Sequence, residues 1–118
     1  MNAFAAGAFL GGVGVLLGAF GAHALRDIGA VRLAWWTTAT HYLFVGAFGM
    51  MLSGLFERSQ RIGFGPATAL LIGAVLFSGS LYAMGLGGPR WLGAITPLGG
   101  LGLVAGFLWM GIRALGSR

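Results

Sequence analysis

Apolar residues form four long runs along the chain, and the charged residues fall in the short segments between them. The runs cover residues 3–25, 34–56, 62–84 and 92–112. Each is close to the roughly 20 residues that an α-helix needs to cross the core of a bilayer. No stretch alternates apolar and polar residues with a period of two, which argues against transmembrane strands. The pattern predicts an all-α integral membrane protein, a four-helix transmembrane bundle in a single domain over residues 1–118.

The charged residues mark the ends of these spans. They are Arg26, Asp27 and Arg32, then Glu57, Arg58 and Arg61, then Arg90, and finally Arg113 and Arg118. The short connections predict antiparallel neighbours, with a tight turn at residues 57–61. Both termini then share one side with four of the arginines, against three on the other side. The positive-inside rule therefore predicts cytoplasmic termini and a multi-pass protein of the bacterial inner membrane.

Composition excludes several classes of protein. Of the 118 residues, 58% are hydrophobic and only 8% are charged, whereas soluble domains carry about 25% charge. This excludes an ordinary soluble enzyme and a disordered tail. The net charge is +5, but the arginines are scattered between apolar runs rather than gathered in a basic stripe, so no nucleic-acid partner is expected. The absence of cysteine excludes disulfides, iron–sulfur clusters and thiolate zinc sites.

Glycine is the most informative residue type, with 24 in the chain. One stripe recurs at steps of three and four along the first predicted helix, and a second follows the fourth; they comprise Gly7, Gly11, Gly14, Gly18 and Gly21, and Gly99, Gly102 and Gly106. Small residues let helix backbones approach closely in a membrane. The stripes predict helix packing, within the bundle or between subunits, so the expected partners are the lipid bilayer and other membrane helices. A substrate groove along the glycines is the alternative.

A comparison of the chain with itself suggests a duplication. An offset of 59 aligns the first helix pair with the second and matches Gly14 with Gly73, Leu17 with Leu76, Thr37 with Thr96, Phe48 with Phe107 and Met51 with Met110. Because glycine and leucine are common here, several such matches arise by chance. The sequence leaves the duplication open.

Polar side chains inside the spans form a candidate intramembrane cluster, which comprises His23, Thr37, Thr40, His41, Tyr42, Ser78, Ser80, Tyr82 and Thr96. Such groups need hydrogen-bond partners within the bundle, and a polar binding pocket is the alternative. His23 lies near the end of the first helix, whereas His41 lies roughly 12 Å into the second at about 1.5 Å per residue. The two histidines are thus poorly placed for one haem, and neither has an acidic partner at helical spacing. We expect no cofactor and no metal.

Two further features concern the ends of the spans. The four tryptophans, at positions 35, 36, 91 and 109, lie near the predicted interfaces and are interpreted as an aromatic belt. Thr96-Pro97 predicts a local kink in the fourth helix, because proline removes a backbone donor.

Three segments carry a family resemblance: GAFGAHAL at residues 18–25, FSGSLY at 77–82 and WLGAITPLGG at 91–100. The chain resembles, over essentially its whole length, the YgdD- and YwdK-like family of small bacterial membrane proteins, domain family 423 of unknown function. The resemblance implies a four-span protein of the inner membrane and supplies no catalytic residues. Family members often have glutamine after the second-helix tyrosine and histidine three residues later, where this chain has Leu43 and Gly46.

Two hypotheses for function follow from these observations. The first is a non-enzymatic protein whose role is association, as a homo-oligomer or as an accessory subunit of a larger membrane complex. The alternative is a small channel or carrier for a neutral or lipid-like solute, with a cavity lined by Thr40, His41, Ser78 and Tyr82. Catalysis is not expected, because the sequence offers no paired acid and base and no nucleophile with a partner.

Overall fold

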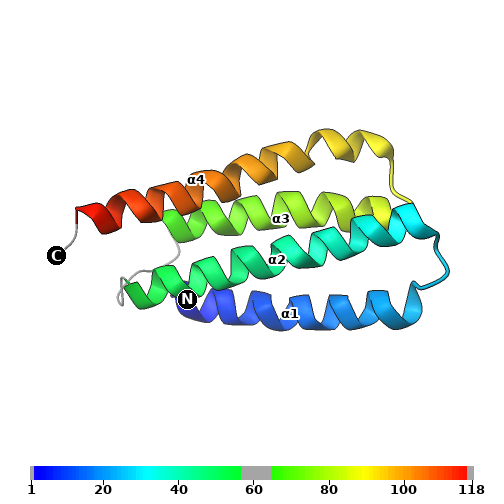
Figure 1. The fold of residues 1–118 in the computed structure, drawn as a ribbon, viewed down its shortest axis with the longest axis horizontal. Coiled ribbons are helices and arrows are strands. Elements are labelled where there is room, and N and C mark those ends of the chain that lie inside the picture. The colour runs from blue at the N-terminus through cyan, green and yellow to red at the C-terminus, as the bar shows by residue number, and fades with distance from the viewer. Residues whose placement is uncertain (1, 57–64, 117–118) are drawn as a thin grey trace.

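The computed structural model describes residues 2–56 and 65–116. Its helices are α1 (Ala3–Ala24), α2 (Ala30–Phe56), α3 (Pro66–Gly85) and α4 (Thr96–Leu115), with a short 3-10 helix, η1 (Arg90–Ala94), before α4. The helices run alongside one another, and α1 begins at the same end of the molecule at which α4 finishes (Figure 1). All four spans are long and apolar enough to cross a membrane. The protein is therefore an all-α, four-span membrane protein.

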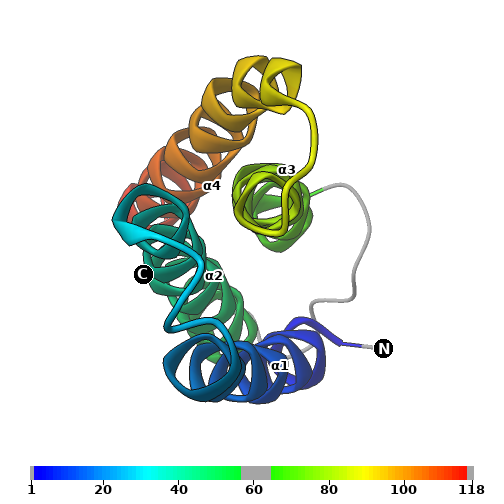
Figure 2. The same cartoon turned by 90° about the vertical axis from the view of Figure 1, so that its right-hand side faces the viewer.

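The large interfaces join helices that are neighbours in the chain: α1 with α2, α2 with α3, and α3 with α4. An end view shows a staggered row with α1 and α4 at its two ends, rather than a closed square (Figure 2). In the most apolar window of each span, 44% of the residues are buried in α2 and in α3, but only 17% in α1 and in the span that contains α4. The rest of the chain therefore leaves most residues of each terminal span uncovered.

Short polar and glycine signals set the helix ends. The Asn2 side chain accepts a hydrogen bond from the Ala5 backbone N–H at 2.8 Å and caps α1, as asparagine does at many helix N-termini. Gly65 precedes α3 and Pro66 occupies its first turn, where the missing N–H of proline costs nothing. Gly29 and Gly87 have a φ of 99°, a left-handed conformation that glycine adopts without strain, and each lies in a connection at the same end of the molecule.

Several predicted boundaries differ from the structure. Helix α3 begins at Pro66 rather than at residue 62, with Gly65 as its N-cap, and α4 ends at Leu115 rather than at residue 112. Helix α2 begins at Ala30 rather than at residue 34, so Arg32 lies in its first turn and its Nε donates to the Gly85 carbonyl at 2.8 Å. The fourth helix begins at Thr96 rather than at residue 92, because residues 90–94 form η1 and Pro97 lies in the first turn of α4. The kink expected within a helix is a break between two helices. The tight turn expected at residues 57–61 lies outside the described residues.

The core lies along the central pair of helices. Leu43 and Met50 of α2 pack with Leu70 and Ala74 of α3 and with Leu103 of α4, and each of these side chains is at most 5% exposed. The interior is thus concentrated on the α2–α3 interface, and it positions the polar groups described next.

Candidate functional site

The glycine stripe of α1 faces α2 along its whole length. A Cβ added at Gly7 would lie 2.6 Å from the Ala47 carbonyl oxygen, and one at Gly14 would lie 2.9 Å from the Phe44 ring. At Gly21 the added atom would overlap the indole of Trp36. Gly11 and Gly18 face the same helix at longer distances, 3.9 Å from Ala47 Cβ and 3.3 Å from Thr40 Cγ2. This stripe therefore packs within the chain.

The stripe of α4 faces α3 in the same way. A Cβ at Gly99 would overlap the backbone nitrogen of Phe77, one at Gly102 would lie 2.9 Å from Gly73 Cα, and one at Gly106 would lie 2.7 Å from Leu70 Cγ. Both stripes thus serve contacts inside one protomer. Any contact between protomers must use other faces of the helices.

Further glycines outside the two predicted stripes are equally tight. A Cβ at Gly46 would lie 2.6 Å from Ala74 Cβ, and one at Gly54 would lie 2.6 Å from the Phe4 backbone nitrogen. A Cβ added at Gly73 on α3 would lie 2.5 Å from the Leu103 backbone nitrogen. The spacing of Gly46, Gly49 and Gly54 along α2 could have indicated a packing face, but polar and aromatic residues interrupt it.

The interior half of the polar cluster ties α2 to α3. Thr40 Oγ1 donates to the Trp36 carbonyl at 3.1 Å, so Tyr82 is the donor in the 2.7 Å bond between its hydroxyl and Thr40 Oγ1. The Ser78 hydroxyl donates to the Ala39 carbonyl at 2.7 Å across the same interface. Thr40 and Ser78 are both buried. These hydroxyls hold two helices in register.

A second pair of hydroxyls fixes the start of α4. Ser80 donates to the Phe77 carbonyl at 2.9 Å, and Thr96 is then the donor in the 2.5 Å bond between the two side-chain oxygens. Ser80 is buried. This bond holds the break before Pro97 against α3.

Trp36 is the residue that sequence reasoning placed wrongly. Instead of joining an interfacial belt, it is only 3% exposed and its Nε1 donates to the Leu17 carbonyl at 2.7 Å. Its ring contacts that of Tyr82 with centroids 4.4 Å apart. The absent side chain of Gly21 creates the space for the indole. Trp36 therefore joins α1, α2 and α3 at one point.

The remaining polar residues lie on the outside of the helices. His23, Thr37, His41 and Tyr42 are all exposed. The Tyr42 ring packs against Phe77, with centroids 4.7 Å apart, and against His41, at 5.2 Å. The cluster expected from the sequence is thus two groups, a hydrogen-bonded interior and an outer polar face.

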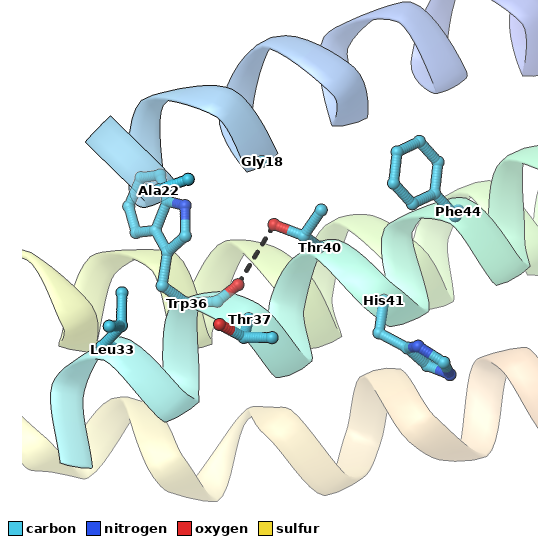
Figure 3. Close-up of a pocket in the computed structure, with 9 residues that line it drawn as sticks. Gly18, Ala22, Leu33, Trp36, Thr37, Thr40, His41 and Phe44 are labelled. Atoms are coloured by element: carbon cyan, nitrogen blue, oxygen red, sulfur yellow. Dashed lines mark hydrogen bonds between the residues drawn. The ribbon is translucent and has the colours of Figure 1, made fainter. Parts of the chain in front are cut away.

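The outer face borders an open groove between α1 and α2 with a volume of about 440 Å³, lined by Gly18, Gly21, Ala22, Leu33, Trp36, Thr37, Thr40, His41 and Phe44. Trp36 and Thr40 point toward α1, whereas His41 points away from it (Figure 3). Ser78 and Tyr82 do not line this groove. The cavity expected from Thr40, His41, Ser78 and Tyr82 together is therefore not formed among the described residues.

The chemistry available to these groups is limited. Within residues 2–56 and 65–116, no three His, Asp or Glu side chains gather as metal ligands, and no buried side-chain nitrogen or oxygen lacks a hydrogen-bond partner. The interior hydroxyls are hydrogen-bonded to backbone carbonyls or to one another. These polar groups therefore fix how the helices pack.

Comparison with known proteins adds a family. Residues 17–100 match the family described as protein of unknown function DUF423. A UPF0382 membrane protein of Staphylococcus epidermidis is 41% identical over 100 residues, which cover 83% of this chain and 82% of the relative. The UPF0382 inner membrane protein YgdD of Escherichia coli strain K12 is 37% identical over 111 residues, 92% of this chain and 85% of the relative. No solved structure matches the chain.

Proposed function

Because the chain belongs to the DUF423 family of membrane proteins, we propose that it is a non-enzymatic protein of the bacterial cytoplasmic membrane that acts by associating with other membrane helices, as a homo-oligomer or as an accessory subunit of a larger complex. The observation that carries the proposal is the open row of helices. Only 17% of the apolar window is buried in each terminal span, so both ends of the row offer a long face to a partner.

The use of the polar side chains supports the same proposal. The hydroxyls of Thr40, Ser78 and Tyr82 are hydrogen-bonded across the α2–α3 interface and stabilise the fold instead of meeting a substrate. The exposed Thr37 and His41 face the outside of the row, where lipid alone would leave polar groups without partners. A helix that packs there would cover them.

A small channel or carrier for a neutral or lipid-like solute is the second candidate. The groove of about 440 Å³ beside Thr37, Thr40 and His41 favours it, since such a groove has the size of a small-ligand site. It has less support than association, because the groove is open along the outside of α1 and α2 and the Ser78 and Tyr82 hydroxyls are bonded elsewhere.

Mass measurement tests the proposal. The protein is extracted into nanodiscs with native lipid, and native mass spectrometry gives the mass of the intact particle. Association predicts a multiple of the 12.1 kDa chain or a stoichiometric complex with another membrane protein. A lone protomer at all protein-to-lipid ratios contradicts it.

Solute flux tests the second candidate separately. A panel of neutral solutes is loaded into proteoliposomes, and flux is compared between the wild type and the His41→Leu variant, which removes a polar ring from the lining of the groove and leaves the interior hydrogen bonds in place. If a monomeric protein shows solute flux that depends on His41, transport replaces association as the proposed function.

We also propose that both termini are cytoplasmic. The support is the excess of arginine at that end, of which Arg113 lies in the last turn of α4, while Arg58, Arg61 and Arg118 lie outside the described residues. A reporter that fluoresces only in the cytoplasm, fused after the C-terminus, is expected to be bright. An active alkaline phosphatase fused at the same point would show instead that the C-terminus lies outside the cytoplasm, which contradicts the proposed orientation.

A further inference from the structure

The two helical hairpins of the protein make the same contacts at an offset of 59 residues. In the first hairpin Gly11 faces Ala47, Gly14 faces Phe44 and Gly18 faces Thr40, whereas in the second Leu70 faces Gly106, Gly73 faces Leu103 and Phe77 faces Gly99. Adding 59 to each residue of the first set produces the second set. In each hairpin the three pairs define one antiparallel register, and the two registers differ by the same 59 residues that align the two halves of the sequence. The hairpins α1–α2 and α3–α4 therefore share one contact register.

In such a repeat, the α2–α3 interface is the contact that joins one unit to the next. Its face on α2 carries Ala39, Gly46 and Ser53, and all three are buried. Its face on α3 carries Ala67 and Ala74, which are at most 1% exposed. Contact is closest in the middle, where a Cβ added at Gly46 would lie 2.6 Å from Ala74 Cβ.

The equivalent faces at the two ends of the row are uncovered. On α4 they carry Leu98, Ala105 and Ile112, all exposed, and on α1 they carry Ala8 and Val15, also exposed. Leu98 is 60% exposed and Ile112 is 67% exposed, although the residues they correspond to on α2, Ala39 and Ser53, are buried. On α4 the large side chains of Leu98 and Ile112 thus flank the small Ala105, which lies opposite Val15 when α1 is placed in the equivalent register.

We propose that copies of this protein associate head to tail, with α4 of one copy against α1 of the next in the register of the α2–α3 interface. The inference rests on the proposed function and names the partner as a second copy of the chain. In this register Ala105 meets Val15 of the neighbouring copy, as Gly46 meets Ala74 within one copy. Such a heterologous contact forms a ring if the rotation closes and a filament if it does not.

The contact between copies is looser than its counterpart inside the chain and lacks the hydroxyl hydrogen bonds of that interface. Ala19 replaces Ser78 and His23 replaces Tyr82 at the equivalent positions, so the hydrogen bonds to Ala39 and Thr40 have no counterpart. Ala105 also carries a Cβ that Gly46 lacks, which sets the helices farther apart. The association therefore depends on side-chain packing, which is the main force between apolar helices in lipid.

The same repeat explains the outer polar groove. Its residues Gly18, His41 and Phe44 correspond to Phe77, Gly100 and Leu103, which line a groove of about 700 Å³ between α2 and α4. In that second groove, one wall comes from the preceding hairpin, through Tyr42 and Val45 of α2. The residues at the equivalent positions of α4 are Leu101 and Val104. In the head-to-tail assembly, Leu101 and Val104 of the preceding copy would complete the polar groove beside His41.

Cysteine cross-linking tests the register, because the natural chain has no cysteine. Val15→Cys and Ala105→Cys are introduced into separate chains with different tags, and both are expressed together and oxidised in native membranes. A disulfide needs Cβ atoms about 3.5–4.5 Å apart. This is more than the distance from an added Cβ at Gly46 to Ala74 Cβ, and it suits the wider helix spacing that Ala105 requires. We expect a cross-linked dimer that carries both tags. When one chain carries both Val15→Cys and Ala105→Cys, we expect a series of cross-linked oligomers larger than a dimer.

The matched control is Val13→Cys paired with Ala105→Cys. Val13 is exposed and lies two positions from Val15 at nearly the same depth, but on another face of α1. Chains with this control pair should therefore remain monomeric under oxidation. Dimers that form from Val15→Cys alone or from Ala105→Cys alone would indicate a symmetric interface and overturn the inference. An oligomeric mass without the Val15–Ala105 cross-link overturns the register and leaves the proposed function standing, whereas a monomeric mass overturns both.

Discussion

Helices α3 and α4 approach each other closely at Gly73, and Gly73→Ala tests what this approach contributes. The added Cβ would lie 2.5 Å from the Leu103 backbone nitrogen and 2.8 Å from the Gly102 carbonyl carbon. Ordinary contacts between carbon atoms are about 3.5–4.0 Å, so the two helices must separate by about 1 Å. The obstructing atoms are backbone atoms and cannot rotate away, as a flexible side chain could.

The size of the effect follows from that separation. A gap of about 0.5–1 Å removes a quarter to a half of the dispersion attraction of each contact. The contacts of Gly99 and Gly102 with α3 weaken together with the contact of Gly73 with α4. Overpacking of a filled core usually costs about 1–3 kcal/mol, and we expect Gly73→Ala to destabilise the protein by about 2–3 kcal/mol.

The matched control lies on the same helix. A Cβ added at Gly79 would meet no atom within 4 Å, so Gly79→Ala should be neutral or stabilising by up to about 1 kcal/mol through helix propensity. Unfolding of both variants by sodium dodecyl sulfate in dodecyl maltoside micelles, followed by far-ultraviolet circular dichroism, measures the difference. Equal stability of Gly73→Ala and Gly79→Ala would refute the close-approach reasoning.

Three further predictions concern the polar and aromatic contacts. A double-mutant cycle with Thr40→Val and Tyr82→Phe should give a coupling of about 0.6 kcal/mol, as is typical of hydroxyl bonds between membrane helices; a coupling of zero would mean that the bond is absent. In a variant whose other tryptophans are phenylalanine, Gly21→Ala should displace Trp36 from its site and shift its fluorescence emission, whereas unchanged emission would contradict the contact. Arg32→Gln should lower the free energy of unfolding by about 0.5–1.5 kcal/mol through loss of its bond to a backbone carbonyl of α3, and an unchanged unfolding curve would count against that bond.

Sequence reasoning was most successful where bilayer thickness is the constraint. The apolar runs predicted four spans, and the end of α2 at residue 56 agrees with the structure. The sequence does not predict the start of α2, because an arginine between two apolar runs is typical of a loop. In the structure the long Arg32 side chain reaches a carbonyl of the next helix from within the first turn of α2. The start of α4 was missed because residues 90–94 are apolar enough to continue a span but form a 3-10 turn before Pro97.

The sequence did less well at separating one side of a helix from another. It grouped Thr40, His41 and Ser78 in one polar cluster, although Thr40 and Ser78 are buried between α2 and α3 and His41 is exposed. It also placed Trp36 at the membrane surface, because a tryptophan near a span end is usually interfacial. Only the absent side chain at Gly21, on another helix, makes room for that indole inside.

By itself, then, the sequence determined that this protein is helical, how many times it can cross a membrane, where most spans begin or end, and which residues are small enough for close packing. The tertiary structure decided which faces meet: that the glycines of α1 pack against α2, that those of α4 pack against α3, and that the two hairpins share one register. The physical reason is that lipid and protein interior are equally apolar. In water, hydrophobicity marks the buried face of a helix, but in a bilayer both faces can be apolar, and the choice between them depends on the fit of one surface to another.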